Sequence, residues 1–174
     1  GHDNYLLAGI QEGFLPDFTL VPKAKTCFLE FNCGDLDFLL PGMSDVMPYP
    51  STIFSRMTAG QLDAYEAAFE ARLEQAKRQF NPDLIHTHHL WIVSKIARRV
   101  FSDIPMVTSC HGTCLRQFFL CPGMDPELGK TMAQIDAVFC LSRHQKQQIR
   151  DIHKINSKKL HVVGAGFEKK LFYP

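Results

Sequence analysis

Histidines gather at the ends of two apolar segments, 84–88 and 105–109, that are predicted to be neighbouring β-strands. They are His86, His88 and His89 at the end of the first segment and His111 just after the second. Because the carboxyl ends of parallel strands meet at one edge of a sheet, we expect these imidazoles to share a rim. A neutral imidazole both donates and accepts hydrogen bonds, which suits recognition of hydroxyl groups.

Three interpretations of these histidines stay open at this point. They could be structural side chains that hydrogen bond to the loop backbone. They could bind a metal, since His86, His88 and His111 together with Cys110 or Cys114 are zinc-type ligands, although their spacing matches no zinc-finger pattern. They could also form an edge that recognises sugar or phosphate groups, which we favour.

Two further side chains near this rim fit a sugar-recognition edge. Trp91 follows the first histidine group, and the face of an indole suits a sugar ring. Arg116 follows the second group and could pair with an acidic acceptor or a diphosphate. The alternative for Arg116 is an exposed helix arginine with no ligand.

The elements that position these residues alternate between strand and helix in the second half of the chain. Strands are predicted over 84–88, 105–109, 137–141 and 160–163, and their starts lie 21 to 32 residues apart. Helices are predicted over 90–100, from the Asp125-Pro126 start, and after the capping box of Ser142 and Gln145. Parallel strands need such crossover helices. We therefore predict an α/β fold with a Rossmann-like open parallel sheet and helices on both faces.

The first eighty residues are less regular. Strands are predicted over 5–9 and 27–31, and a capping box of Thr58 and Gln61 begins an amphipathic helix that runs to about residue 79. The segment 41–52 contains three prolines and no periodic pattern. Because long irregular loops in compact domains are often functional, we interpret it as a lid that faces a substrate.

Composition and missing motifs exclude several classes of protein. The chain has 174 residues, 45% of them hydrophobic and 21% charged, with a net charge of +1, which is typical of one globular domain and gives no general reason to expect nucleic-acid binding. It contains no run of 18 apolar residues and no visible signal peptide. Its six cysteines are too sparse for a disulfide-built fold, so free thiols in the cytoplasm are expected. The dinucleotide, P-loop and serine-hydrolase motifs are absent.

Four segments in order carry a resemblance to a known family. They are Asn-Pro-Asp-Leu-Ile-His-Thr-His-His-Leu-Trp (81–91), Val-Thr-Ser-Cys-His-Gly-Thr (107–113), Ile-Asp-Ala-Val-Phe-Cys-Leu-Ser (135–142) and Leu-His-Val-Val-Gly-Ala-Gly-Phe-Glu-Lys-Lys-Leu-Phe-Tyr-Pro (160–174). Together they resemble the N-terminal domain of the family-4 (group 1) glycosyltransferases, which have the GT-B fold. The segment from Pro41 to Phe54 also resembles the acceptor-side loop of a bacterial branch of that family.

The resemblance implies an enzyme with two Rossmann-like domains that face each other across a cleft. The N-terminal domain binds a sugar or lipid-linked acceptor, and the C-terminal domain holds most of the nucleotide-sugar donor. Transfer retains the configuration of a hexosyl group and needs no metal or separate cofactor. The family's His-Gly-Thr segment corresponds to His111, Gly112 and Thr113 here, so His111 is expected to reach the donor sugar. A cytoplasmic enzyme, with peripheral membrane contact as an option, is implied.

Two departures from the family pattern bear on the domain organisation. The family's opening strand with its glycine-rich loop and its C-terminal donor domain are not found in this sequence. We therefore expect residues 1–174 to be a single acceptor-side domain, a fragment that does not catalyse transfer alone. Half of a nucleotide-sugar epimerase and a non-catalytic α/β binding module are the alternatives.

Overall fold

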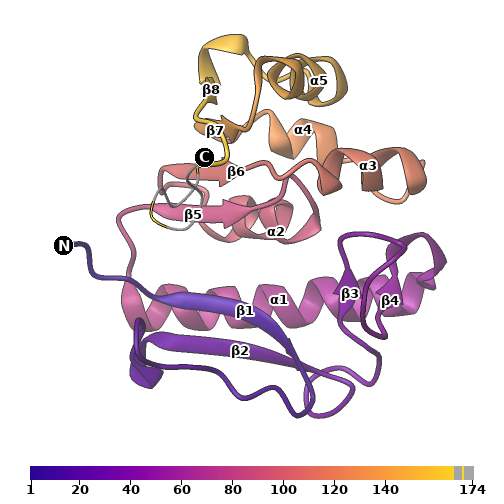
Figure 1. Ribbon diagram of the computed structural model, residues 1–174. Helices are drawn as coiled ribbons and strands as arrows, with labels where there is room; N and C mark the ends of the chain where they lie inside the picture. The colour runs from indigo at the N-terminus through magenta and orange to yellow at the C-terminus, as the bar shows by residue number, and fades with distance from the viewer. Residues whose placement is uncertain (167–169, 171–174) are drawn as a thin grey trace.

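A computed structural model describes residues 1–166 and residue 170 of the chain (Figure 1). The predicted class is confirmed, because the described strands lie in parallel sheets and alternate with helices in the second half. The three short 3₁₀ helices are η1 (Lys23–Lys25), η2 (Phe54–Arg56) and η3 (Ser157–Lys159). No helix in the described part of the chain is both long and apolar enough to cross a membrane.

The second half forms a four-stranded parallel sheet in the order β5-β6-β7-β8. Its strands are β5 (Ile85–His88), β6 (Met106–Ser109), β7 (Ala137–Cys140) and β8 (Leu160–Val162). The connecting helices are α2 (Ile92–Val100), α3 (Thr113–Leu120), α4 (Leu128–Met132) and α5 (Arg143–His153). All four predicted strands are therefore confirmed within one residue at each end. Helix α3, which directly follows the histidine after β6, was not predicted as a separate element.

Helix α4 begins later than the sequence predicts. We expected Asp125 to cap a helix at Pro126, but the helix begins at Leu128. One Asp125 carboxylate oxygen accepts a hydrogen bond from the Glu127 backbone N–H at 3.0 Å, and the other lies 2.5 Å from the buried Lys95 ammonium. Asp125 therefore makes the hydrogen bond of a capping residue, but the residues that directly follow it form a turn that precedes the helix.

The first half pairs two strands in parallel beside a long helix. Strand β1 (Leu6–Gln11) pairs with β2 (Thr26–Phe31), and α1 (Ala59–Phe80) packs against both. The capping box is present as predicted, with the Thr58 hydroxyl accepting from the Gln61 N–H at 3.2 Å and the Gln61 amide accepting from the Thr58 N–H at 3.0 Å. The buried residues of α1 lie at the predicted three- and four-residue steps: Tyr65, Phe69, Leu73 and Ala76.

The strands of the two halves do not form one continuous sheet. In the described residues β1 pairs only with β2, and β5 pairs only with β6. A cavity of about 670 Å³ lies between them and is lined by residues of both strands and by apolar side chains of α1. Figure 1 shows β1 and β5 running in the same direction on either side of this region. The predicted open sheet is therefore divided at one position, with an unpaired strand edge on each side.

The two faces of the four-stranded sheet differ in burial. Thr108, Val138 and Leu160 are adjacent in register and buried beneath the helices. On the opposite face the neighbouring row of side chains, His88, Ser109, Phe139 and His161, is exposed or half-buried. Among the described residues, helices therefore bury one face of this four-stranded sheet, not both faces as we had predicted, and side chains on the other face are available for contact with other groups.

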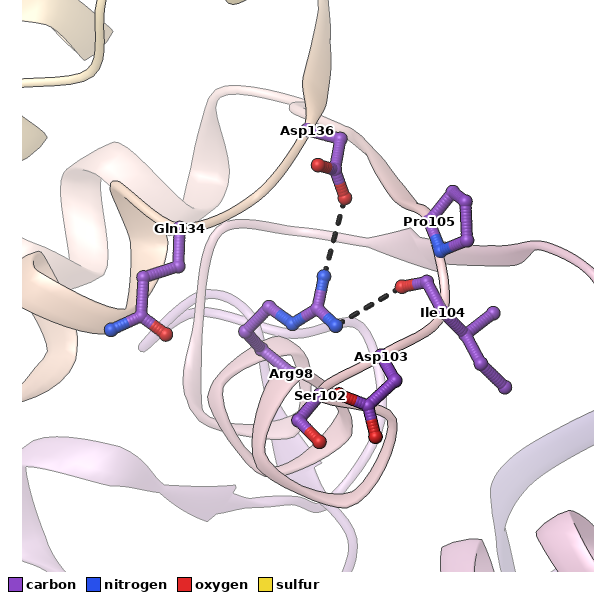
Figure 2. A pocket seen from close by; sticks show the side chains of 7 residues that line it. All are labelled: Arg98, Ser102, Asp103, Ile104, Pro105, Gln134 and Asp136. Atoms are coloured by element: carbon purple, nitrogen blue, oxygen red, sulfur yellow. Dashed lines mark hydrogen bonds and ion pairs between the residues drawn. The ribbon is translucent and has the colours of Figure 1, made fainter.

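A smaller hollow at the amino ends of β6 and β7 has a structural role (Figure 2). Its centre is the Arg98 guanidinium, which lies 3.2 Å from the Asp136 carboxylate and donates to the backbone carbonyl oxygens of Phe101 and Ile104. The Asp136 carboxylate also accepts from the Met106 N–H at 2.8 Å. Because these bonds use the Arg98 donors to hold the loop before β6, this hollow is not our candidate site.

Candidate functional site at the carboxyl end of the sheet

The four predicted histidines form one contiguous cluster, which we call the imidazole cluster. The rings of His86 and His88 are stacked with centroids 4.9 Å apart, and those of His88 and His111 are nearly parallel with centroids 5.1 Å apart. The His89 ring meets His111 edge to face at 5.0 Å. The cluster therefore runs from the exposed face of β5 to the turn that follows β6.

Strand register brings the cluster together. His88 lies opposite Ser109 in the parallel ladder, and the residue after β5 continues the pairing, because the His89 N–H donates to the Ser109 carbonyl oxygen at 2.9 Å. The Ser109 hydroxyl lies 2.9 Å from His86 Nε2. His88 Nδ1 lies 2.8 Å from His111 Nε2. The rim expected from the strand ends is therefore present.

The backbone around His89 and Gly112 adopts uncommon conformations that orient the cluster. His89 has φ +69°, and its carbonyl oxygen accepts a hydrogen bond from the buried Ser94 hydroxyl at 2.5 Å. Gly112 has φ +91° and precedes the first residue of α3. A side chain at Gly112 would be strained and would approach the Gln145 amide at 3.4 Å. Glycine therefore allows the chain to turn from His111 into the helix.

The surroundings favour the neutral form of two rings in the cluster, His88 and His111. Loss of solvation, together with the neighbouring imidazoles, lowers the pKa of His88 and the pKa of His111 below the ordinary value of 6.5. In the bond between His88 and His111 one ring nitrogen donates and the other accepts, so at least one of the two rings is neutral. The lowered pKa values of His88 and His111 therefore favour uncharged rings, which can both donate and accept hydrogen bonds.

The other predicted site residues do not all lie at the rim. Gly112 and Thr113 lie next to His111, and the Thr113 hydroxyl is 3.4 Å from His89 Nδ1. Arg116 is exposed on α3. Trp91, however, is only 4% exposed, and its ring packs edge to face against the buried Phe54 at 5.7 Å. The indole belongs to the core, so it does not present a face at the rim.

The irregular segment 41–52 lies beside the site. It contains the short parallel strands β3 (Pro41–Gly42) and β4 (Thr52–Ile53) and is therefore more ordered than a plain loop. The Asp45 carboxylate accepts a hydrogen bond from the buried Gln117 amide of α3 at 3.2 Å. Because α3 begins next to His111, this bond links the segment to the helix that supports the rim.

Metal binding is not supported by the geometry of the described residues. Among residues 1–166 and 170, no group of three or more histidine, cysteine or acidic side chains is arranged to hold a metal ion. The imidazole nitrogens are used for contacts within the cluster and to Ser109 instead. Of the three interpretations of the histidines, the metal site thus has the least support.

Several residues that shape the site were not identified from the sequence as parts of it. Ser109 and Ser94 act through hydrogen bonds to His86 and to the His89 carbonyl oxygen. Gln145 was predicted only as half of a capping box, but its amide oxygen accepts from the Leu141 N–H at 2.7 Å. The position of Ser109 at the end of a predicted strand was the one signal in the sequence, because that end lies at the same edge as the histidines.

Comparison with known proteins identifies the class. Residues 50–170 match the family described as Glycosyltransferase Family 4, which covers more than half of the chain. The chain belongs to this family and is of the glycosyltransferase type. A comparison with curated protein sequences finds no match.

Several solved structures are similar to the chain. One of them is the alpha,alpha-trehalose 6-phosphate synthase from Burkholderia multivorans, with 12% sequence identity and a TM-score of 0.47. The match covers 87% of this chain and 43% of that one. The chain thus spans less than half the length of this synthase.

Proposed function

We propose that the chain is the acceptor-binding domain of a retaining glycosyltransferase that moves a hexosyl group from a nucleotide-sugar to an acceptor hydroxyl. The observation that carries this proposal is the imidazole cluster at the carboxyl end of the sheet, in a chain of Glycosyltransferase Family 4. In parallel α/β sheets this is the end at which ligands bind.

The cluster has the chemistry that positioning of a sugar requires. Sugar hydroxyls both donate and accept, and the exposed His86, His88 and His111 rings can do the same. His111 is the residue we assign to the reacting sugar. It is exposed, and its ring is held by His88 on one side and His89 on another. A ring fixed in this way can orient a sugar with little additional loss of conformational entropy.

Gly112, Thr113 and Arg116 extend the proposed site along α3. The lack of a Gly112 side chain lets a ligand approach the backbone at the start of the helix, and helix N-termini favour negatively charged groups. The exposed Arg116 could pair with an acidic acceptor or a diphosphate.

We also propose that these 174 residues act as part of a longer polypeptide. The unpaired edges of β1 and β5 on either side of the 670 Å³ cavity support an additional strand between them, which corresponds to the opening strand of the family. A second domain of the same polypeptide would bind the nucleotide-sugar donor. In this proposal the enzyme works in a bacterial cytoplasm, with or without peripheral membrane contact, and the 174 residues alone do not catalyse transfer.

The test is a substitution at His111 in the longer enzyme that contains this domain. We expect His111→Ala to lower kcat for sugar transfer by about 10²-fold, the usual cost of removing one positioned hydrogen-bonding group. Thermal stability should change little because the side chain is exposed. The matched control is His2→Ala, an exposed histidine before the amino end of β1.

Two results would contradict parts of the proposal. A wild-type kcat for His111→Ala would remove His111 from the mechanism. Measurable sugar transfer by the isolated 174 residues, tested with a panel of nucleotide-sugars, would refute the claim that a second domain is required. The two outcomes are independent, since the first concerns one residue and the second the domain organisation.

A further inference from the structure

Two buried cysteines, Cys110 and Cys114, flank the turn that carries His111. Cys110 follows the last residue of β6 and is 1% exposed, and Cys114 lies in the first turn of α3 and is 0% exposed. Their sulfur atoms are 3.5 Å apart. No other two sulfur atoms among the described residues are in hydrogen-bonding contact, and all six cysteines are free.

We propose that Cys110 and Cys114 form an oxidation site that a hydroperoxide converts into an intramolecular disulfide closing the turn around His111. A disulfide needs a sulfur–sulfur distance near 2.05 Å, so the two sulfur atoms must approach by about 1.5 Å. The residues between them are only His111, Gly112 and Thr113. The inference concerns the thiols alone and does not depend on sugar transfer.

The surroundings distinguish the two thiols. The hydrogen bond with Cys110 and the nearby His89 ring lower the pKa of Cys114. The same hydrogen bond and burial raise the pKa of Cys110. Cys114 is therefore the thiolate that reacts first, and Cys110 is the thiol that resolves the product.

The reaction is balanced with one hydroperoxide. The Cys114 thiolate attacks one peroxide oxygen, an S–O bond forms as the O–O bond breaks, and the leaving oxygen takes up a proton. With hydrogen peroxide this gives a sulfenic acid and water. Cys110 sulfur then attacks the Cys114 sulfur, the S–O bond breaks, and a second water leaves with the thiol proton. Two thiols are oxidised and the peroxide is reduced.

The turn between the thiols is suited to closing in this way. Gly112 already has a positive φ of 91° and no side chain to obstruct the movement, and α3 has no side-chain cap at its first residue. Because both sulfur atoms are buried, the oxidant must reach them through an opening of this turn. We therefore expect oxidation to be accelerated by urea below the unfolding transition.

Alkylation after exposure to hydrogen peroxide tests the proposal directly. The chain is treated with peroxide, denatured and alkylated with N-ethylmaleimide, and its intact mass is measured. We expect the number of labels to fall from the six of the reduced chain to four and to return to six after dithiothreitol. Trypsin releases residues 100–116 as one peptide, which should carry the loss of two hydrogen atoms.

Variants and spectra assign the loss of labels to this pair of thiols. Cys114→Ser should abolish the loss, whereas the matched control Cys121→Ser, at another buried cysteine next to α3, should still lose two labels. In wild-type chain the ring resonances of His111 should shift on oxidation and recover on reduction. Six labels after peroxide, or a link between any other two cysteines, would overturn the proposal even if Cys114→Ser fails to fold.

Discussion

His153 is a buried side chain for which the structure predicts a large effect of pH on stability. It is the last residue of α5, is 2% exposed, and neither ring nitrogen has a hydrogen-bond partner. Its ring packs edge to face against Phe118 at 5.4 Å. Loss of solvation lowers the pKa of His153 from 6.5 to about 4. The folded chain therefore holds this imidazole in its neutral form.

The sign and size of the effect follow from proton linkage. Below pH 6.5 the unfolded chain protonates His153 while the folded chain does not, so the free energy of unfolding falls as the pH falls. With the two pKa values of 6.5 and about 4, the His153 contribution at pH 5 is a loss of about 2 kcal/mol relative to pH 7.5. The full loss is reached only below pH 4.

Urea unfolding of wild type and His153→Leu at both pH values measures this contribution. Leucine fills similar space without a titratable group, so the pH-dependent loss should be about 2 kcal/mol smaller in the variant. His144→Leu, an exposed histidine on the same helix, is the control and should keep the wild-type difference. Equal pH dependence in wild type and His153→Leu would refute the reasoning. An NMR titration of His153 with a midpoint near 6.5 would do so without any variant.

Three further predictions address the capping box, the buried arginine and the imidazole cluster. Thr58→Ala should lower the free energy of unfolding by about 1 kcal/mol in urea, because it removes the hydroxyl that caps α1; no change would show that the cap is not stabilising. Arg98→Met should lower the free energy of unfolding by about 2 to 3 kcal/mol, because two backbone carbonyl oxygens lose their donor while the exposed Asp136 is partly solvated. Calorimetry measures this loss, and an unchanged stability would contradict the prediction. NMR titration of His88 and His111 should give midpoints below 6.5, so protonation of these two rings also reduces the free energy of unfolding as the pH falls. Midpoints above 6.5 would contradict the lowered pKa values of the two rings.

The local elements of this protein could be predicted well from the sequence. The capping box at Thr58, the apolar stripe of α1 and the four short strands of the second half all depend on neighbouring residues, and local pattern is enough to define them. The ion pair between Asp125 and Lys95 could not be predicted, because the two residues lie thirty positions apart and only the folded chain brings them together.

The candidate site, too, could be predicted from the sequence only in part. Parallel strands with histidines at their ends were enough to predict that His86, His88 and His111 would meet at one rim. Trp91 lies in the same sequence segment, yet its ring turns into the core against Phe54. The direction of a large side chain at a strand–helix junction depends on which apolar surface the rest of the fold supplies, and sequence neighbours do not determine that surface.

The strands, the long helix and the placement of imidazoles at strand ends could all be derived from the order of the residues, because hydrophobic period and chain direction are local properties. Three other properties emerge only in the folded chain: β1 and β5 remain unpaired across a cavity, Cys110 and Cys114 come into contact, and the pKa values of His88 and His111 are lowered. These properties depend on distances between separate elements and on the solvent that packing removes. Both are set when the elements assemble.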